Sequence, residues 1–366
     1  MIGSLAYWAP GILAFFIILG LLVLVHELGH FITARLSGMR VLEFGIGFPP
    51  RARVLGHDHE TEYTLNYLPI GGFVRLEGEE ADSDDPRAFA NSSLLKQTVV
   101  LTAGVAMNLV TAFLLFFVVS WLVVPTVRPT VRQYAPQSTV QQAGLVVGDE
   151  IVSIDGKTFQ WLNLAEAPWQ TFQDYTRSHG GQPVTMEVID PNGQHRTLSF
   201  TLGRYDPANN EYPLGAQIDY NLTYTQGDPV TGVRTAITST GEALSLVAVG
   251  LGNLANQIAS HPTQAPQGVS GPIGIAQDTA AVLNLFGPGL LLLLAAVLSA
   301  NLALINILPI PPFDGGKLAI QVIKRVFGAR GVSAYEITTN LVGFALLMVF
   351  LAWISYFDII RAGSGG

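Results

Sequence analysis

The chain has 366 residues, of which 49% are hydrophobic and only 13% are charged. Soluble domains carry about a quarter charged residues, so this composition indicates a membrane protein with a polar insert. The formal net charge of −8 argues against nucleic acid as a partner. The chain has no cysteine, which excludes disulfides and thiolate ligands, so a bound metal would be held by His, Asp or Glu.

The first predicted element is a transmembrane helix within residues 1–33, starting near Pro10. No positive charge precedes its apolar run and no small-residue cleavage site follows it, so we interpret it as a retained helix rather than a secretory signal. The helix contains His26-Glu27-Leu28-Gly29-His30, an H-E-x-x-H motif. Positions i and i+4 share one helical face, so both imidazoles can hold one metal ion while Glu27 polarises its water. These polar groups are costly at membrane depth unless they are functional, which weighs against a chance match.

Residues 34–96 are predicted to form a membrane-associated β-sheet loop. We expect strands over residues 61–68 and 72–76, joined by a turn at Pro69-Ile70-Gly71-Gly72. His57 and His59 are rival candidates for metal ligands, although an H-x-H sequence in a turn is more often solvated.

The second apolar span covers residues 97–125 and contains Ala103-Gly104-Val105-Ala106-Met107-Asn108. Small residues suit close helix packing in lipid. For Asn108 we favour a structural hydrogen bond to a neighbouring helix over a place near the candidate metal site.

Residues 126–204 resemble one bacterial PDZ domain, on the series Ala143-Gly144-Leu145, Gly148-Asp149 and Asp155-Gly156. Strands are expected over residues 184–189 and 197–202, around an Asn192-Gly193 turn. PDZ domains bind extended peptides by strand addition, and the alternative is a folded spacer. Residues 205–283 are predicted to contain a strand over 212–225 and a helical segment over 229–258 at the membrane surface.

The third span belongs to segment 284–337 and ends in Asn306-Ile307-Leu308-Pro309-Ile310-Pro311-Pro312-Phe313-Asp314-Gly315. The prolines stop the helix and force extended backbone. Asp314 then lies at the membrane edge as an oxygen donor that could complete a His₂-carboxylate zinc site. A fourth span lies within residues 338–366, so the expected fold is a polytopic α-helical membrane protein of about four transmembrane helices with the β-sheet loop and one inserted extracytoplasmic PDZ domain.

The distribution of basic residues predicts the orientation of these spans. Lys and Arg number seven in residues 34–96, seven in 126–283 and four in 309–337. The first and third segments are the richer per residue, so they are predicted to be cytoplasmic, with the termini and the PDZ region outside. Spans one and three then both run inward, which brings His30 and Asp314 to the same cytoplasmic depth.

Taken together, these motifs resemble the site-2 protease family of intramembrane zinc metalloproteases, specifically its RseP-like bacterial branch. The resemblance covers nearly the whole chain, and the Asp-Gly motif in a third span makes the H-E-x-x-H motif specific. It also includes Pro69-Ile70-Gly71-Gly72-Phe73-Val74, the pattern formed by Ala103-Gly104 and Asn108, and Ser270-Gly271-Pro272-Ile273-Gly274. One departure is the single PDZ unit, because some members carry two in tandem.

The resemblance implies a zinc metalloendopeptidase that hydrolyses peptide bonds within transmembrane segments, as in regulated intramembrane proteolysis. It implies zinc on His26, His30 and Asp314, with Glu27 as general base. It also implies that Asn306 helps to hold the substrate and that the strand at Gly72 and Phe73 pairs with it.

The resemblance further implies a multi-pass protein of the bacterial inner (cytoplasmic) membrane, with its active site near the cytoplasmic face. Its partners would be the lipid bilayer and transmembrane protein substrates, such as an anti-sigma factor or a remnant signal peptide, with a possible upstream site-1 protease. Two other classes of protein were weighed. A catalytically silent PDZ scaffold is disfavoured by the intact motif residues, and a metal transporter by polar residues gathered at one end of the spans.

Overall fold

The computed structural model describes residues 2–58, 60–79, 82–134, 138–161, 167–204, 213–260, 266, 268–328 and 334–363. His59, residues 135–137 of the expected PDZ domain and residue 212 of the expected strand lie outside these residues. The chain divides into two compact units, and each is described by itself. Unit 1 comprises Met1–Phe116 and Ala243–Gly366, and unit 2 comprises Phe117–Glu242.

Five of the described helices are long and apolar enough to cross a membrane, one more than expected. The four expected ones are α1 (Ile2–Leu36), α2 (Leu94–Leu122), α7 (Gly289–Ile307) and α9 (Ala334–Gly363). The additional one is α5 (Pro229–Ser260), the segment expected at the membrane surface, whose best window has the lowest mean hydropathy of the five, 1.2. Such helices form in lipid because all their backbone groups are paired internally.

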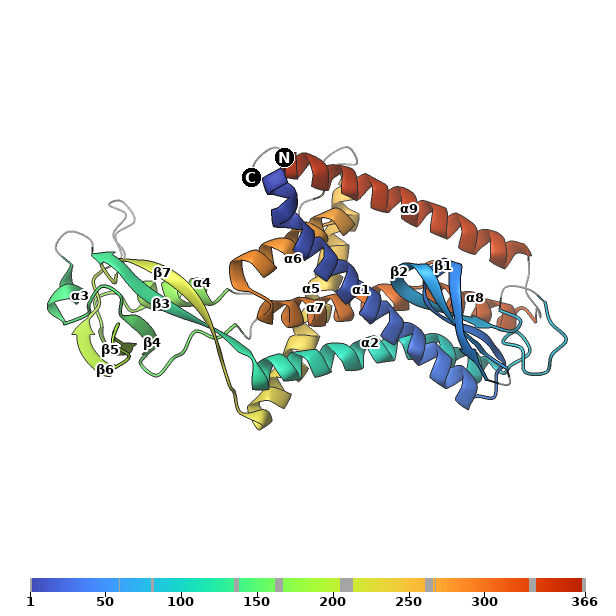
Figure 1. Ribbon diagram of the computed structural model, residues 1–366, viewed down its shortest axis with the longest axis horizontal. Helices are drawn as coiled ribbons and strands as arrows, with labels where there is room; N and C mark the ends of the chain where they lie inside the picture. Colours follow the sequence, from blue (N-terminus) through green and yellow to red (C-terminus); the bar gives the residue numbers. More distant parts are fainter. Residues whose placement is uncertain are drawn as a thin grey trace. The chain divides into compact units, whose positions relative to one another are not determined.

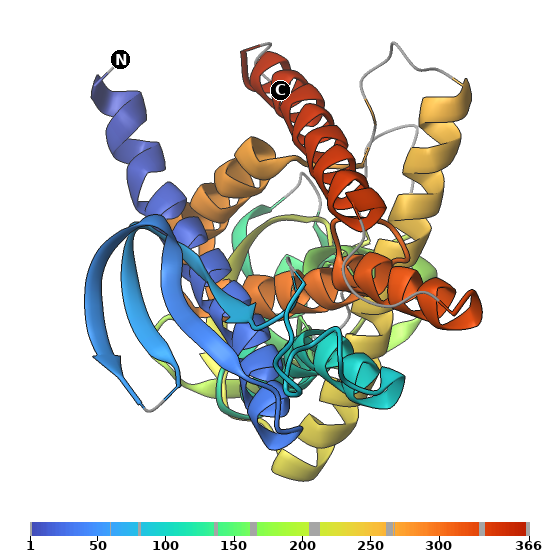
Figure 2. The same cartoon turned by 90° about the vertical axis from the view of Figure 1, so that its right-hand side faces the viewer.

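The strands β1 (Val41–His57) and β2 (Glu62–Leu76) form a separate sheet in unit 1 (Figure 2). The expected turn at residues 69–72 is wrong, because β2 continues through it. Ile46 pairs with Gly72 and Phe48 with Leu68, so one residue of β1 faces three of β2. This bulge absorbs the extra residues that a turn would have used.

One strand segment of this sheet lies at its edge. Residues 43–46 of β1 pair with 72–75 of β2 on one side and with 62–65 on the other. Among the strand pairings of the described residues, segment 72–76 has partners on only one side, in 41–46. Its other side therefore presents unpaired backbone groups to any chain that lies alongside.

Unit 2 contains one antiparallel sheet with the strand order β6-β5-β4-β3-β7. Its strands are β3 (Val124–Tyr134), β4 (Glu150–Ile154), β5 (Pro183–Ile189), β6 (His195–Thr201) and β7 (Ala216–Thr225). The hairpin of β5 and β6 lies where the sequence predicted it. The pairing of β7 with β3 along its whole length carries the sheet past residue 204, where the PDZ segment was expected to end (Figure 1).

Two helices accompany this sheet in unit 2, α3 (Thr139–Gln142) and α4 (Pro168–Ser178). The hydrophobic core of the unit lies between the strands and α4. Its fully buried members include Val131, Ile151, Ile154, Met186 and Phe172. Alternate residues of β5 point into this core, which is the period-two pattern of a sheet covered on one face.

The glycines of the Ser270-Gly271-Pro272-Ile273-Gly274 stretch allow a buried carboxylate to cap α6 (Pro272–Phe286). The backbone N–H groups of Gly271 and Gly274 donate to Asp358 of α9, at 3.3 and 2.8 Å. A Cβ at Gly274 would lie 2.9 Å from the Asp358 carboxylate, so only glycine leaves room for it. The carboxylate satisfies N–H groups that lack partners within the helix.

Candidate metal centre

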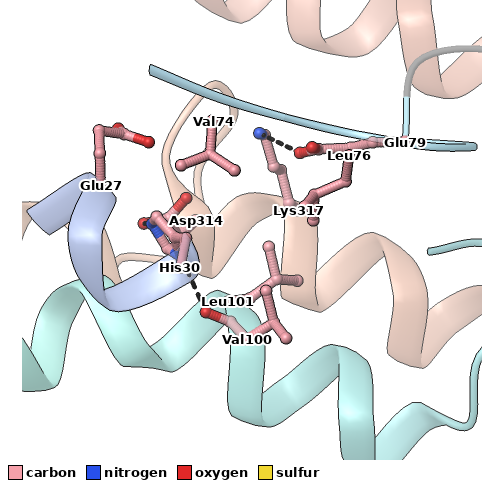
Figure 3. A pocket seen from close by; sticks show the side chains of 9 residues that line it. All are labelled: Glu27, His30, Val74, Leu76, Glu79, Val100, Leu101, Asp314 and Lys317. Atoms are coloured by element: carbon pink, nitrogen blue, oxygen red, sulfur yellow. Dashed lines mark hydrogen bonds and ion pairs between the residues drawn. The ribbon is translucent and has the colours of Figure 1, made fainter. Parts of the chain in front are cut away.

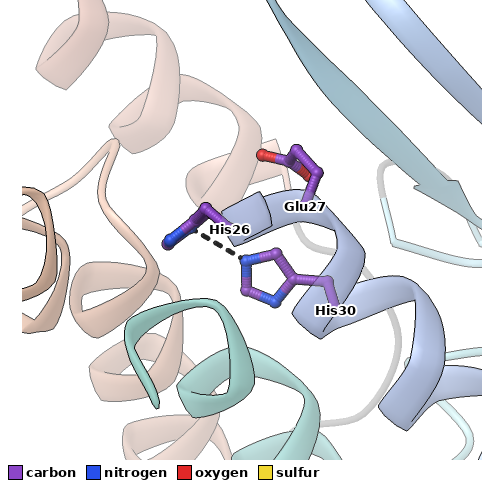
Figure 4. A group of neighbouring side chains, drawn as sticks. All are labelled: His26, Glu27 and His30. Carbon is purple, nitrogen blue, oxygen red and sulfur yellow. Dashed lines mark hydrogen bonds between the residues drawn. The ribbon is translucent and has the colours of Figure 1, made fainter. Parts of the chain in front are cut away.

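The last buried turns of α1 place two imidazoles side by side (Figure 4). His26 and His30 are 6% and 8% exposed, and their Nε2 atoms are 3.1 Å apart. Ligand atoms of both rings and of the Glu27 carboxylate all lie within 4.8 Å of one another. The i, i+4 spacing thus produces the shared face that the sequence predicted.

Asp314, 288 residues from His26 in the chain, completes the group. Its Oδ2 lies 2.9 Å from Nε2 of His26 and 3.2 Å from Nε2 of His30. Ligands that surround a tetrahedral zinc ion at 2.0–2.1 Å are about 3.3 Å apart, so this spacing fits three ligands of one ion. Two neutral imidazoles and a carboxylate with an open fourth position are a donor set that suits zinc.

Two glycines bring Asp314 into place at the start of α8 (Asp314–Val326). A Cβ at Gly315 would lie 2.1 Å from the carbonyl oxygen of Ile307, the last residue of α7. A Cβ at Gly316 would lie 2.5 Å from the carbonyl carbon of Ile310. The chain therefore turns back tightly after α7, and no side chain fits at either position.

One face of α2 supports the two histidines, through positions 100, 104 and 108, which are each four residues apart. Nδ1 of His30 donates to the carbonyl oxygen of Val100 at 2.7 Å. This hydrogen bond places the proton on Nδ1 and leaves Nε2 of His30 free to bind a metal.

Gly104 leaves the space in which the two Nε2 atoms lie. A Cβ at this position would be 2.5 Å from Nε2 of His30 and 2.6 Å from Nε2 of His26. The sequence analysis placed Gly104 in a motif of the family resemblance, but the structural role that we gave it was helix packing in lipid. The sequence did contain an indication that Gly104 and Asn108 act together, because a spacing of four residues puts both on one face of α2.

Asn108 is fully buried and contacts the other ring, with Nδ2 3.1 Å from Nδ1 of His26. Its Oδ1 has no hydrogen-bond partner among the described residues. Turning the amide by half a turn exchanges these two atoms, so that Oδ1 accepts the Nδ1 proton of His26 and Nε2 is left to bind the metal. Asn108 therefore contacts a neighbouring helix, as we favoured from the sequence, and its partner on that helix is a residue of the site, so both alternatives hold.

The edge segment of β2 runs past the same group. A Cβ at Gly72 would lie 2.8 Å from the carbonyl oxygen of Gly45 and 3.9 Å from Cγ of Glu27. Val74 and Leu76 line a cavity of about 60 Å³ together with Glu27, His30 and Asp314 (Figure 3). The half-buried Phe73 packs its ring against Gly45 instead.

Asn306 lies half-buried in the last turn of α7. None of the hydrogen bonds found within the described ranges joins it to His26, His30 or Asp314. His57, the other rival ligand in the described residues, lies at the far end of β1 and is outside the group of candidate metal ligands.

Charges on α8 complete the electrostatics of the site. The carboxylate of Glu79 raises the pKa of Lys317, and its Oε1 lies 2.7 Å from the Lys317 ammonium nitrogen. Lys317 is thus a cation at neutral pH.

Comparison with known proteins gives consistent matches along the chain. The model of Peptidase family M50 matches residues 14–350. A relative from Clostridium acetobutylicum is 31% identical, with 93% of this chain and 95% of the relative covered. Relatives from Clostridium perfringens and a Synechocystis species are each 32% identical, covering 93% and 90% of this chain and 95% and 89% of their own. All three are named as candidate zinc metalloproteases.

Proposed function

The chain belongs to peptidase family M50, the site-2 protease family, and we propose that it cleaves peptide bonds within transmembrane segments of other proteins. It is a membrane protein and a zinc metallopeptidase. One observation supports cleavage within the membrane. Asp314 contacts His26 and His30, and both histidines lie within an apolar helix long enough to span a bilayer.

We assign the roles at this site from the geometry. His26, His30 and Asp314 would hold zinc, and Glu27 would act as general base. Zinc, when bound, lowers the pKa of water and polarises a carbonyl group. Glu27 takes a proton from the attacking water and passes it to the leaving amine. The contacts to Val100 and Asn108 keep both rings in the required tautomer and orientation.

The edge segment 72–76 is suited to hold the substrate. A peptide bond inside a transmembrane helix is shielded by the helix's own hydrogen bonds, so the substrate must unwind before water can attack. An edge strand offers the released backbone groups new partners. The position of Gly72 next to Glu27, and of Val74 on the cavity wall, supports this assignment. For Asn306, the proposed role in substrate binding rests on the family motif alone.

Four membrane crossings agree best with the contacts of the site. α2 begins near His30 and α7 ends near Asp314, so the start of α7 and the end of α2 lie on the same side of the membrane. The chain between them must therefore cross an even number of times. If α5 crossed the membrane, α6 would have to cross it in the opposite direction. With 15 residues α6 is about 22 Å long, which is shorter than the hydrocarbon core of a bilayer. We infer that α5 does not cross.

The orientation follows from the density of basic residues, with the β-sheet loop and α8 in the cytoplasm of a bacterial cell and unit 2 outside. We expect a cysteine introduced at the exposed Ser178 of unit 2 to react with an impermeant thiol reagent in intact cells. A cysteine at the exposed Ser93 should react only after the cells are opened. The chain has no cysteine of its own, so wild type is the background control. The reverse pattern would invert the orientation.

We propose that unit 2 is a PDZ domain that extends to the end of β7. Residues of α4 and β7, among them Phe172, Thr176, Ala216 and Ile218, line a groove of about 330 Å³ beside the edge strand β7. An extended peptide can add to such an edge. Selection of substrates already shortened by a site-1 protease would follow from this groove or from steric exclusion by unit 2.

A single-span substrate with a tag at each end tests the proposed activity directly. Purified protein in lipid vesicles should cut it within the apolar segment, at a position that mass spectrometry of the two fragments identifies. A chelator should stop cleavage and added zinc should restore it, because no residue replaces the metal. Cleavage only in the substrate's soluble flanks, or unaffected by the chelator, would contradict the proposal.

A further inference from the structure

Lys317 lies at the wall of the metal centre without a role in holding it. It follows Asp314 by three residues on α8, so both side chains lie on one face of the helix. Among the described residues that line the cavity of about 60 Å³ with Glu27, His30 and Asp314, it is the only Lys or Arg (Figure 3). A positive charge at this place can stabilise the negative charge that develops on the carbonyl oxygen during peptide hydrolysis.

The ammonium group of Lys317 can donate more hydrogen bonds than it makes within the described residues. It donates to Oε1 of Glu79 at 2.7 Å, and no second acceptor is found for it within the described ranges. An ammonium carries three N–H donors, so two remain available. The Lys317 side chain is 35% exposed and that of Glu79 is 16% exposed, so the ion pair is not sealed from solvent.

We propose that Lys317 is a catalytic residue that stabilises the oxyanion formed when water attacks the scissile carbonyl, with Glu79 as its positioning residue. The inference rests on the proposed peptidase function. Hydrogen-bond donors placed where charge develops stabilise the transition state more than the substrate. The tether to Glu79 fixes the ammonium before the reaction and leaves its other donors free.

The step balances with the residues already assigned. The water oxygen bonds to the carbonyl carbon, the carbonyl π electrons move to the carbonyl oxygen, and Glu27 takes a water proton. The oxyanion then re-forms the double bond, the C–N bond breaks, and the amine nitrogen takes the proton from Glu27. Lys317 keeps its own protons throughout and contributes charge only.

The alternative is that Lys317 and Glu79 form a purely structural ion pair, and the chain contains a matched control for this. Lys324, also on α8, pairs with Glu336 of α9 at 2.8 Å. These side chains are 13% and 8% exposed, so the control pair is the more buried of the two. Lys324 is not among the residues that line the metal cavity. A structural role predicts equal effects at Lys317 and Lys324, and a catalytic role predicts different ones.

Kinetics of Lys317→Met and Lys324→Met in zinc-loaded protein give the first test. We expect Lys317→Met to lower kcat by roughly 100-fold with KM and zinc content unchanged, as for loss of an oxyanion donor. The kcat of Lys324→Met should stay within about threefold of the wild-type value, because this residue would make no contact with the transition state. Similar kcat values for the two variants would overturn the inference.

Binding measurements give a readout that structural damage would not reproduce. A phosphinic peptide carries a tetrahedral, anionic centre, and Lys317→Met should weaken its binding by the same factor as kcat/KM. Binding of uncleaved substrate, measured in a Glu27→Gln background, should not change. Equal weakening of both ligands would show a structural role and overturn the inference.

A second variant covers the case in which Lys317→Met does not fold. Glu79→Gln keeps the shape of the partner but loses its charge, and we expect kcat to fall about tenfold with full zinc content. If kcat of Glu79→Gln stays at the wild-type value, the positioning role is wrong and the inference fails. Failure of the wild-type protein to cleave any transmembrane substrate would instead refute the proposed function itself.

Discussion

Replacing Glu27 by Gln is expected to lower the cleavage rate by about 10²–10⁴-fold while the zinc content stays at the wild-type value. The substitution removes the proton acceptor and keeps the size of the side chain. None of the proposed zinc ligands changes, since these are His26, His30 and Asp314. The measurement is cleavage of the tagged single-span substrate, with metal analysis of the same preparation.

A glutamate away from the site provides the control for this change. Glu60 is 42% exposed and pairs with Arg87 on the surface, so Glu60→Gln should cleave at the wild-type rate. If Glu27→Gln retains near wild-type activity, Glu27 is not the base. If Glu27→Gln loses its zinc as well, the carboxylate acts in metal binding, and the assigned roles must be exchanged.

Replacing Gly104 by Ala is expected to remove most of the zinc and, with it, the activity. The added methyl group would lie 2.5–2.6 Å from the Nε2 atoms of His30 and His26, the atoms that would face the ion. Both rings are tied to α2 through Val100 and Asn108, so they cannot withdraw without losing these hydrogen bonds. Zinc per chain, measured on purified protein, should fall as far as in Asp314→Ala, which removes a ligand outright.

The helix itself should tolerate this substitution, which makes the result specific to the metal. Alanine is favoured over glycine in a helix interior by about 1 kcal/mol. Gly250→Ala on α5 is a matched control, because nothing lies within 4 Å of a Cβ there, and it should keep its zinc. Full zinc occupancy in Gly104→Ala would show that the ion binds elsewhere than between these rings.

The mechanism joins four segments that are distant in the chain. In the proposed mechanism, α1 would supply two ligands and the base, α2 would orient the rings, the edge of β2 would pass beside the base, and α8 would bring the third ligand and a cation. Three of these segments, β2, α2 and α8, contribute through glycine, at positions 72, 104, 315 and 316, where backbone atoms or the proposed metal ligands approach too closely for a side chain. The density of glycine at the site reflects this crowding.

Local sequence pattern predicted that the two histidines lie side by side and where the third apolar helix ends. A helix of fixed geometry makes the i, i+4 histidines share a face, so the H-E-x-x-H motif needed no tertiary information. The prolines before Asp314 predicted an end to the helix there, and the structure ends α7 at Ile307. The long apolar runs became helices for the same local reason, because each satisfies its backbone hydrogen bonds within itself.

The tertiary structure decided what depends on contacts between distant segments. A strand pairs with whichever segment lies beside it, so local pattern could not show that β2 runs through residues 69–72 or that β7 completes the sheet of unit 2. The place of Asn108 against His26, the space at Gly104 and the position of Lys317 on the cavity wall arise only when α2 and α8 pack around α1. The side-chain type of each residue limits the contacts that it can make, and the packing of the helices determines which of these contacts form.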